Sequence, residues 1–361
     1  MKRPDLPVLT TLRFPAAFAI FLYHFLSMTS CPLWIWEGLN MGVSFFYILS
    51  GFILYYNYSS LENRRSFWVA RLARIWPIHL VTCLMALLLL PFPFLLGHAS
   101  WPITLPANLL LVHAWLPFKG SALSFNGVSW SLSVEAFFYL SFPWLLTVLH
   151  KRGAGTLLPG AFAVGLILIS LINFYSPARA DLCVVFNPVG RLFEFVLGMC
   201  TCKFWLTGSR STTQRGLWLG YEALVILLSA ALVVGLPPLL QLWGMDNNAV
   251  DRWLITDIGA LGFAGLIWVF AHQAGFISKT LSTPFLTRLG EISFSMYMCH
   301  QILLRWLVGD RTELSVADVC RIFPIYLLLS LVVAMALFFL VETPARHAIV
   351  SAYRRRFPSR S

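Results

Sequence analysis

The sequence predicts an all-α fold: a polytopic bundle of about ten membrane-spanning helices with both termini on the cytoplasmic side. Three observations support this. Of the 361 residues, 58% are hydrophobic and only 11% are charged, whereas roughly 25% of the residues in a soluble domain are charged. Apolar runs close to the roughly 20 residues that cross a bilayer recur along the whole chain. Lys and Arg gather in alternate connections between these runs.

The apolar runs are interpreted as helices because only helices and closed barrels satisfy their backbone groups in lipid. In chain order they are 8–28, 41–58, 75–96, 129–149, 156–174, 188–206, 217–235, 254–271, 291–308 and 322–341. The first contains Arg13 and lacks a small-residue cleavage site, so we expect a retained span rather than a signal peptide. Residues 105–116 are apolar but short. We interpret 97–128 as a lid or re-entrant piece on the outer side, with a shallow surface helix as the alternative.

The net charge of +11 indicates orientation rather than a nucleic-acid partner. With the N-terminus inside, most of the 26 Lys and Arg residues fall in inner segments, as the positive-inside rule requires. Residues 1–345 are expected to form the transmembrane domain, followed by a short basic cytoplasmic tail over 346–361. The seven cysteines lack metal-ligand spacing, so no metal is expected. A disulfide among Cys31, Cys183 and Cys320 in predicted outer loops stays an open alternative.

Ionisable residues within spans are costly and usually face a cavity or a partner. Arg13 and His24 lie eleven residues apart in the first span, about 16 Å along the axis and on nearly the same face. The fourth span enters the membrane from the outer side, so Glu135 lies in its outer half, at about the depth of His24. A carboxylate near an imidazole fixes its tautomer and raises its basicity, so we expect the two to share a cavity. His300 is the next partner to consider, and a structural role for each residue is the alternative.

Two Arg pairs have helical i, i+3 spacing. Arg71 and Arg74 stand at the predicted cytoplasmic mouth of the third span, where paired guanidiniums suit a phosphate. Plain positive-inside charge is the alternative for them. Arg191 and Glu194 are expected to form an internal salt bridge that helps two spans to pack. His113, in the outer lid, is by default a surface histidine, with contact to an acceptor as the alternative.

Seven motifs follow one another along the chain. They are Arg13 with His24, GVSFFYILSGFIL (Gly42 to Leu54), Arg71 with Arg74, WSLSVE (Trp130 to Glu135), FEFVLG (Phe193 to Gly198), LGEISFSMYMCH (Leu289 to His300) and VETPAR (Val341 to Arg346). In order and spacing this series resembles the acyltransferase-3 family of membrane O-acyltransferases over nearly the whole chain. One departure is visible: that family often has a second Glu after the position of Glu135, where this chain has Ala136.

The resemblance implies transfer of an acyl group, often acetyl, from cytoplasmic acyl-coenzyme A to a hydroxyl of a carbohydrate or glycolipid. It implies a multi-pass protein of the bacterial inner membrane, with lipids as its surroundings. It implies His24 as the catalytic residue. From the chemistry of the side chains, His24 would act as general base or carry the acyl group transiently, and Glu135 would orient it. Arg71 and Arg74 are implied as part of the donor site, and Arg13 is grouped with them.

Two other functions fit the same architecture. Buried charges and Pro-interrupted helices are also typical of transporters, although no inverted repeat is visible in the sequence. A flippase or scaffold partner of a glycan-export system, without acyl-transfer chemistry, is the second alternative.

Overall fold

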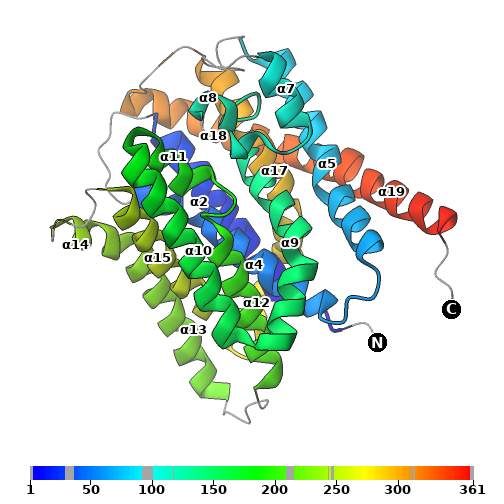
Figure 1. Ribbon diagram of the computed structural model, residues 1–361. Helices are drawn as coiled ribbons and strands as arrows, with labels where there is room; N and C mark the ends of the chain where they lie inside the picture. The colour runs from blue at the N-terminus through cyan, green and yellow to red at the C-terminus, as the bar shows by residue number, and fades with distance from the viewer. Residues whose placement is uncertain are drawn as a thin grey trace. The chain divides into compact units, whose positions relative to one another are not determined.

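The computed structural model describes residues 3–28, 36–91, 101–116, 118–208, 215–242, 244, 248–309, 311 and 314–357 (Figure 1). Throughout this part of the chain the regular structure is helical, without a β-strand, which confirms the all-α fold class. The chain forms two compact units. The first comprises Met1–Tyr23, Leu33–Ser59 and Trp144–Glu291, and the second comprises His24–Pro32, Ser60–Pro143 and Ile292–Ser361.

Together with the C-terminal part of α9 (Trp130–Arg152) and the first residues of α17 (Pro284–Val308), the first unit holds helices from its three sequence ranges. They are α1 (Pro7–Thr11), most of α2 (Arg13–Leu26), α3 (Trp36–Leu39), α4 (Gly42–Tyr58), α10 (Ala154–Tyr175), α11 (Pro177–Phe186), α12 (Leu192–Thr207), α13 (Arg215–Ala230), the π-helix η2 (Ala231–Gly235), α14 (Leu236–Leu242), α15 (Ala249–Ala271) and α16 (Phe276–Leu281). Within this unit α4 packs closely on α12, and α13 packs on α15.

Glycines determine the close approach of α4 and α12. A Cβ atom on Gly51 would overlap the carbonyl oxygen of Phe195, and a Cβ atom on Gly198 would overlap the carbonyl oxygen of Ile48. Small residues let helix backbones approach closely in lipid, where no hydrophobic force between helices is available. Gly51 of the SGF motif therefore packs against α12, and Gly198 of the FVLG motif packs against α4.

A buried ionic cluster lies beside this contact. The expected pair is present, with 3.1 Å between Arg191 Nε and Glu194 Oε2. Arg191 Nη2 also donates to Ser44 Oγ on α4 at 3.0 Å, and its guanidinium lies 5.5 Å from the ring centroid of Tyr47. Asp257 on α15 is only 4% exposed and lies within electrostatic reach of the pair. The cluster thus ties three helices of the first unit together.

The second unit holds the remaining helices. They are α5 (Arg64–Leu89), α7 (Trp101–Leu109), the 3-10 turn η1 (His113–Trp115), α8 (Lys119–Ala122), the N-terminal part of α9 (Trp130–Arg152), most of α17 (Pro284–Val308), α18 (Val316–Leu337), the π-helix η3 (Phe338–Glu342) and α19 (Thr343–Arg356). The final helix α19 packs along α5, as Figure 1 shows for the red and blue ribbons. Residues 343–356, which include most of the predicted basic tail, are therefore helical.

Seven helices of the described residues are long and apolar enough to cross a membrane. Each of the ten predicted spans coincides with a helix in its described part, and residues 92–96 of the third span lie outside the described residues. Two of the other three, α4 and α12, have only 17 and 16 residues. The third, α17, carries several charged residues. The count of ten spans, and the cytoplasmic position of both termini, therefore stay predictions.

The third span begins earlier than expected. It was predicted from residue 75, whereas α5 begins at Arg64 and is capped by Asn63, whose side chain accepts a hydrogen bond from Ser66 N at 3.0 Å. The reason is that residues 64–74 are amphipathic: Phe67, Arg71 and Ile75 follow helical spacing and are all buried. A hydropathy count misses such a segment because its charges lower the average.

The segment on the predicted outer side is built from short helices. The nine residues of α7 rise only about 13 Å, less than half of the roughly 30 Å hydrocarbon core. This favours the lid interpretation over an additional span. Cys183 and Cys320 both have free thiols, and Cys31 lies outside the described residues.

Candidate active site

The end of α2 and the middle of α17 bring two imidazoles together. His24 Nδ1 lies 3.0 Å from His300 Nε2, and the two ring centroids are 5.0 Å apart. On its other side, His300 Nδ1 lies 2.6 Å from the carbonyl oxygen of Tyr297. His300 is fully buried, while His24 is half-buried. The predicted catalytic residue His24 is thus hydrogen-bonded to His300, which the sequence analysis considered as its partner after Glu135.

Packing against α18 fixes the turn that carries His24. The neighbouring Phe25 is 1% exposed and stacks on the ring of Tyr326, with 5.5 Å between centroids. It also contacts Phe323 at 5.2 Å. A buried aromatic pair holds its backbone firmly, so the position of His24 is set by the hydrophobic residue next to it.

Glu135 has a different direct partner. Its Oε1 accepts a hydrogen bond from the Tyr139 hydroxyl one turn later in α9. The Arg71 guanidinium lies 5.9 Å from the centroid of the Tyr139 ring, and Arg74 is also within electrostatic reach of this phenol. Trp68 Nε1 donates to the Tyr139 carbonyl at 3.0 Å. The predicted donor-binding arginines and Glu135 therefore converge on Tyr139, which the sequence analysis missed.

Arg71 lies inside its helix rather than in the first turn, and its place at the cytoplasmic mouth of the span stays a prediction. Because α5 begins at Arg64, Arg71 lies about 10 Å along the helix axis. Its side chain is 8% exposed, whereas its neighbours Leu72 and Trp76 are 52% and 39% exposed. A charge that only marks topology would point outward like these neighbours. Arg71 instead points into the second unit, and this favours a binding role.

Tyr297 connects the histidine pair with the helix of Glu135. Its hydroxyl lies 2.9 Å from Ser131 Oγ and 3.2 Å from the Val128 carbonyl. Ser131 and Glu135 are four residues apart on one face of α9, and Glu135 is within electrostatic reach of the Tyr297 hydroxyl. His24, His300, Tyr297 and Glu135 thus occupy one neighbourhood of the second unit. Direct cooperation between His24 and Glu135 stays a prediction.

Arg13 opens α2 and belongs to the first unit, so its expected role in donor binding also stays a prediction. In the described part of the chain, the structure places no group of three or more His, Cys, Asp or Glu side chains where they would hold a metal ion.

The lid histidine is a structural residue, contrary to the default expectation of a surface side chain. His113 is fully buried, with its Nε2 3.3 Å from Ser129 Oγ and its ring stacked on His79 at 6.1 Å. Burial lowers the pKa of His113 to about 3, and the nearby His79 adds to this effect. The chain turns inward at Leu111, whose φ is 57°, and this turn directs the following imidazole to the interior. His113 is therefore neutral at physiological pH and fastens the lid.

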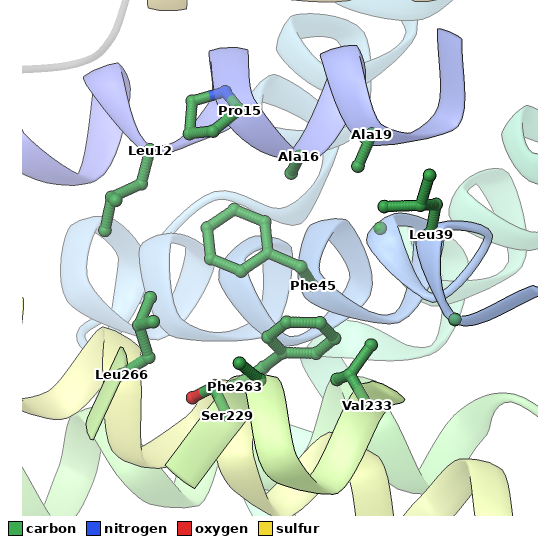
Figure 2. A pocket seen from close by; sticks show the side chains of 13 residues that line it. Leu12, Pro15, Ala16, Ala19, Leu39, Phe45, Ser229, Val233, Phe263 and Leu266 are labelled. Carbon is green, nitrogen blue, oxygen red and sulfur yellow. The ribbon is translucent and has the colours of Figure 1, made fainter. Parts of the chain in front are cut away.

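The first unit contains an apolar cavity of about 280 Å³. Figure 2 shows Ala16 and Ala19 on α2 facing Phe45 and Phe263 across it. The single hydroxyl in its lining, Ser229 Oγ, donates to the Gly262 carbonyl at 2.8 Å. None of the lining residues is titratable, so this cavity supplies no group able to move a proton.

Comparison with known proteins decides the family. Residues 7–343 match the acyltransferase-3 family, described as "Acyltransferase domain". The chain belongs to the acyltransferase-3 family. This confirms the resemblance seen in its motifs and makes the protein an acyltransferase.

Three relatives show how far the likeness extends. This acyltransferase is 30% identical to "Acyltransferase MdmB" of Streptomyces mycarofaciens over 324 residues, covering 83% of this chain and 79% of MdmB. It is 24% identical to "O-acetyltransferase OatA" of Staphylococcus aureus, covering 94% of this chain and 57% of OatA. It is 25% identical to "Nodulation protein 10" of Rhizobium leguminosarum bv. viciae, covering 74% of this chain and 72% of that protein. No solved structure matches the acyltransferase.

Proposed function

We propose that this acyltransferase is a multi-pass protein of the bacterial inner membrane that transfers an acyl group, with acetyl as the expected one, from cytoplasmic acyl-coenzyme A. The acceptor is a hydroxyl of an extracytoplasmic glycan, glycolipid or glycoside. The carrying observation is the half-buried His24 imidazole, held by His300 in the same unit as the arginines near Tyr139. The relative named an O-acetyltransferase supports an oxygen acceptor.

The chemistry needs one base and one place for the departing thiolate. As the acceptor oxygen attacks the thioester carbonyl, the C–O bond forms and the C–S bond breaks. His24 takes the hydroxyl proton and then gives it to the thiolate of coenzyme A as that group leaves. An imidazole performs this near neutral pH without large tuning of its pKa. Glu135 supplies negative charge near the site, held in place by its hydrogen bond with Tyr139.

The donor-binding part of the proposal rests on Arg71 and Arg74. Guanidiniums hold phosphates through paired, charge-assisted hydrogen bonds, and acyl-coenzyme A carries several phosphates. Arg71 is already ordered against Tyr139, so binding a phosphate costs little additional side-chain entropy. Tyr139 also donates to Glu135, so the arginine and the carboxylate share one neighbour.

The test uses purified protein in liposomes with labelled acetyl-coenzyme A and glycan acceptors, assayed for ester formation. His24→Ala should abolish transfer, while unfolding temperature and monodispersity stay at the wild-type values. Wild-type protein that neither hydrolyses nor transfers the label would indicate a transporter or flippase instead. Deletion of the gene, followed by mass analysis of surface glycans for a lost acyl increment, identifies the acceptor.

A further inference from the structure

We infer that His300 is a positioning residue that holds His24 in the tautomer with hydrogen on Nδ1, which puts the basic lone pair of His24 on Nε2. The inference deepens the proposed function and rests on it. It is carried by two distances and by the single-donor chemistry of neutral imidazole.

The first distance fixes His300. A carbonyl oxygen only accepts hydrogen bonds, so at 2.6 Å from Tyr297 O the Nδ1 atom of His300 carries the hydrogen and donates it. A charged imidazolium is costly to bury, and His300 is fully buried. The neutral ring has only one N–H group. Its Nε2 atom therefore has a lone pair and acts as an acceptor.

The second distance then fixes His24. Its Nδ1 lies 3.0 Å from His300 Nε2, which only accepts, so His24 Nδ1 is the donor. In neutral His24 the lone pair is consequently on Nε2. This nitrogen is the one that takes a proton from an acceptor hydroxyl or attacks a carbonyl carbon. Along this series, His24 donates a hydrogen bond to His300, and His300 donates one to the Tyr297 carbonyl.

The same arrangement stabilises the charge that develops during transfer. When Nε2 of His24 gains a proton, the ring becomes an imidazolium and its hydrogen bond to His300 becomes charge-assisted. Such bonds are roughly twice as strong as neutral ones, so His300 stabilises the transition state more than the ground state. His300 thus has the orienting role of the carboxylate in a hydrolase triad, without bringing a negative charge into the membrane.

The fixed position of His300 supports this role. It belongs to α17, and its hydrogen-bonded carbonyl belongs to Tyr297, whose hydroxyl is anchored on Ser131 and Val128. Asn126 Nδ2 donates to the carbonyl of the next residue, Met298, at 2.8 Å. The bonds of the Tyr297 hydroxyl and the Met298 carbonyl thus hold this turn of α17 against residues 126–131, so the imidazole of His300 is supported by a rigid element.

The kinetic test compares two substitutions in the full-length protein. His300→Gln places an amide oxygen near the position of Nε2 and still accepts from His24, whereas His300→Phe fills the space without an acceptor. General base catalysis contributes about 10²–10⁴-fold, so we expect His300→Phe to lower kcat at least about 100-fold, with KM for acyl-coenzyme A unchanged. His300→Gln should recover most of that loss. Equal losses in both variants would overturn the positioning role.

His272 provides the matched control. Its Nδ1 also lies 2.9 Å from a carbonyl oxygen, that of Trp268, but it belongs to the first unit, whereas His24 and His300 belong to the second. His272→Phe should leave kcat within about two-fold of wild type, since it removes the same kind of local hydrogen bond without touching the base. Retention of kcat in His300→Phe would contradict the inference as well.

A second measurement reports the tautomer directly, without activity. In ¹⁵N-histidine-labelled protein, the signals of His24 are assigned by their loss in His24→Ala, and their ¹⁵N shifts identify the protonated nitrogen. We expect hydrogen on Nδ1 in wild type and a mixture of tautomers in His300→Phe. Hydrogen on Nε2 in wild type would overturn the inference. Full activity of His24→Ala would instead overturn the proposed function, so the two failures are distinguishable.

Discussion

Glu222 should be a strong determinant of stability, because its carboxylate caps a helix to which it does not belong. The short helix α16 follows Gly275, which has no side chain to cap it. Glu222 Oε2 accepts from Ile277 N at 2.9 Å, and Oε1 accepts from Gly275 N and Ser278 N at 3.1 and 3.2 Å and from the Ser278 hydroxyl. With 1% exposure, these bonds are protected from water.

The expected magnitude follows from these four bonds. A hydrogen bond to a charged group contributes about 1.5–3 kcal/mol, and the contributions of one network are not additive. Glu222→Gln keeps one oxygen but turns an NH₂ group toward backbone N–H donors, leaving buried donors without acceptors. We therefore expect it to lower the free energy of unfolding by about 3 kcal/mol, measured by equilibrium unfolding with SDS in mixed micelles.

Glu291 and Gly275 supply the controls for this prediction. Glu291 pairs with Arg288 at 2.6 Å, but the two side chains are 38% and 59% exposed, so Glu291→Gln should change stability by less than about 0.5 kcal/mol. A Cβ atom on Gly275 would overlap the Glu222 carboxylate, so Gly275→Ala should cost a similar amount and add little to Glu222→Gln. Equal stability of the Glu222 and Glu291 variants would refute the reasoning.

Four further outcomes are expected. Burial lowers the pKa of His113 to about 3, so the unfolded chain binds a proton at this residue at a higher pH than the folded protein does. The free energy of unfolding should therefore be constant above the unfolded pKa of about 6.5 and should fall by about 1.4 kcal/mol per pH unit as the pH decreases toward 3. His113→Gln should reduce this loss of stability at acid pH. In the buried cluster, Arg191 can neutralise one carboxylate, and its direct partner is Glu194. Asp257→Asn should therefore keep the free energy of unfolding within about 1 kcal/mol of the wild-type value, while Glu194→Gln lowers it by about 3 kcal/mol. A larger loss in Asp257→Asn than in Glu194→Gln would contradict the pairing. Gly198→Ala should lower the unfolding midpoint, whereas Gly160→Ala, with open space around its Cβ position, should not. Arg71→Ala should raise the dissociation constant for acyl-coenzyme A at least about ten-fold in isothermal titration, with only partial recovery in Arg71→Lys; unchanged affinity would leave Arg71 a packing residue.

The helices could be predicted from the sequence because lipid leaves the backbone few alternatives. Every predicted span coincides with a helix in its described part, although the start of α5 at Arg64 was missed. A hydropathy average treats residues 64–74 as polar, while the structure buries Phe67 and Arg71 on one face of them. The periodicity of the residues, rather than their average, contained the missing information.

The active-site partners were harder to predict because the position of a residue along its span gives only its depth in the membrane and says nothing of its lateral position in the bundle. His24 and Glu135 were paired by their similar distance from the outer surface, yet direction around the bundle axis is unknown before folding. The structure instead hydrogen-bonds His24 to His300, 276 residues away. The contact between Glu135 and Tyr139 was accessible from the sequence, since residues four apart on a helix are neighbours.

The family motifs have equal weight in the sequence, but the structure shows two physical kinds of residue among them. Gly51 and Gly198 allow two helices of the first unit to touch, and Arg191 with Glu194 fastens the same contact. The motifs of the second unit instead carry the hydrogen-bonded polar groups, the His24–His300 pair among them. Loss of activity after substitution therefore has two meanings. In the first group it should accompany loss of folded protein, and only in the second should kcat fall in a protein of normal stability. Membership in a family motif is consequently no evidence of catalysis until the unfolding free energy of the variant has been measured beside its rate.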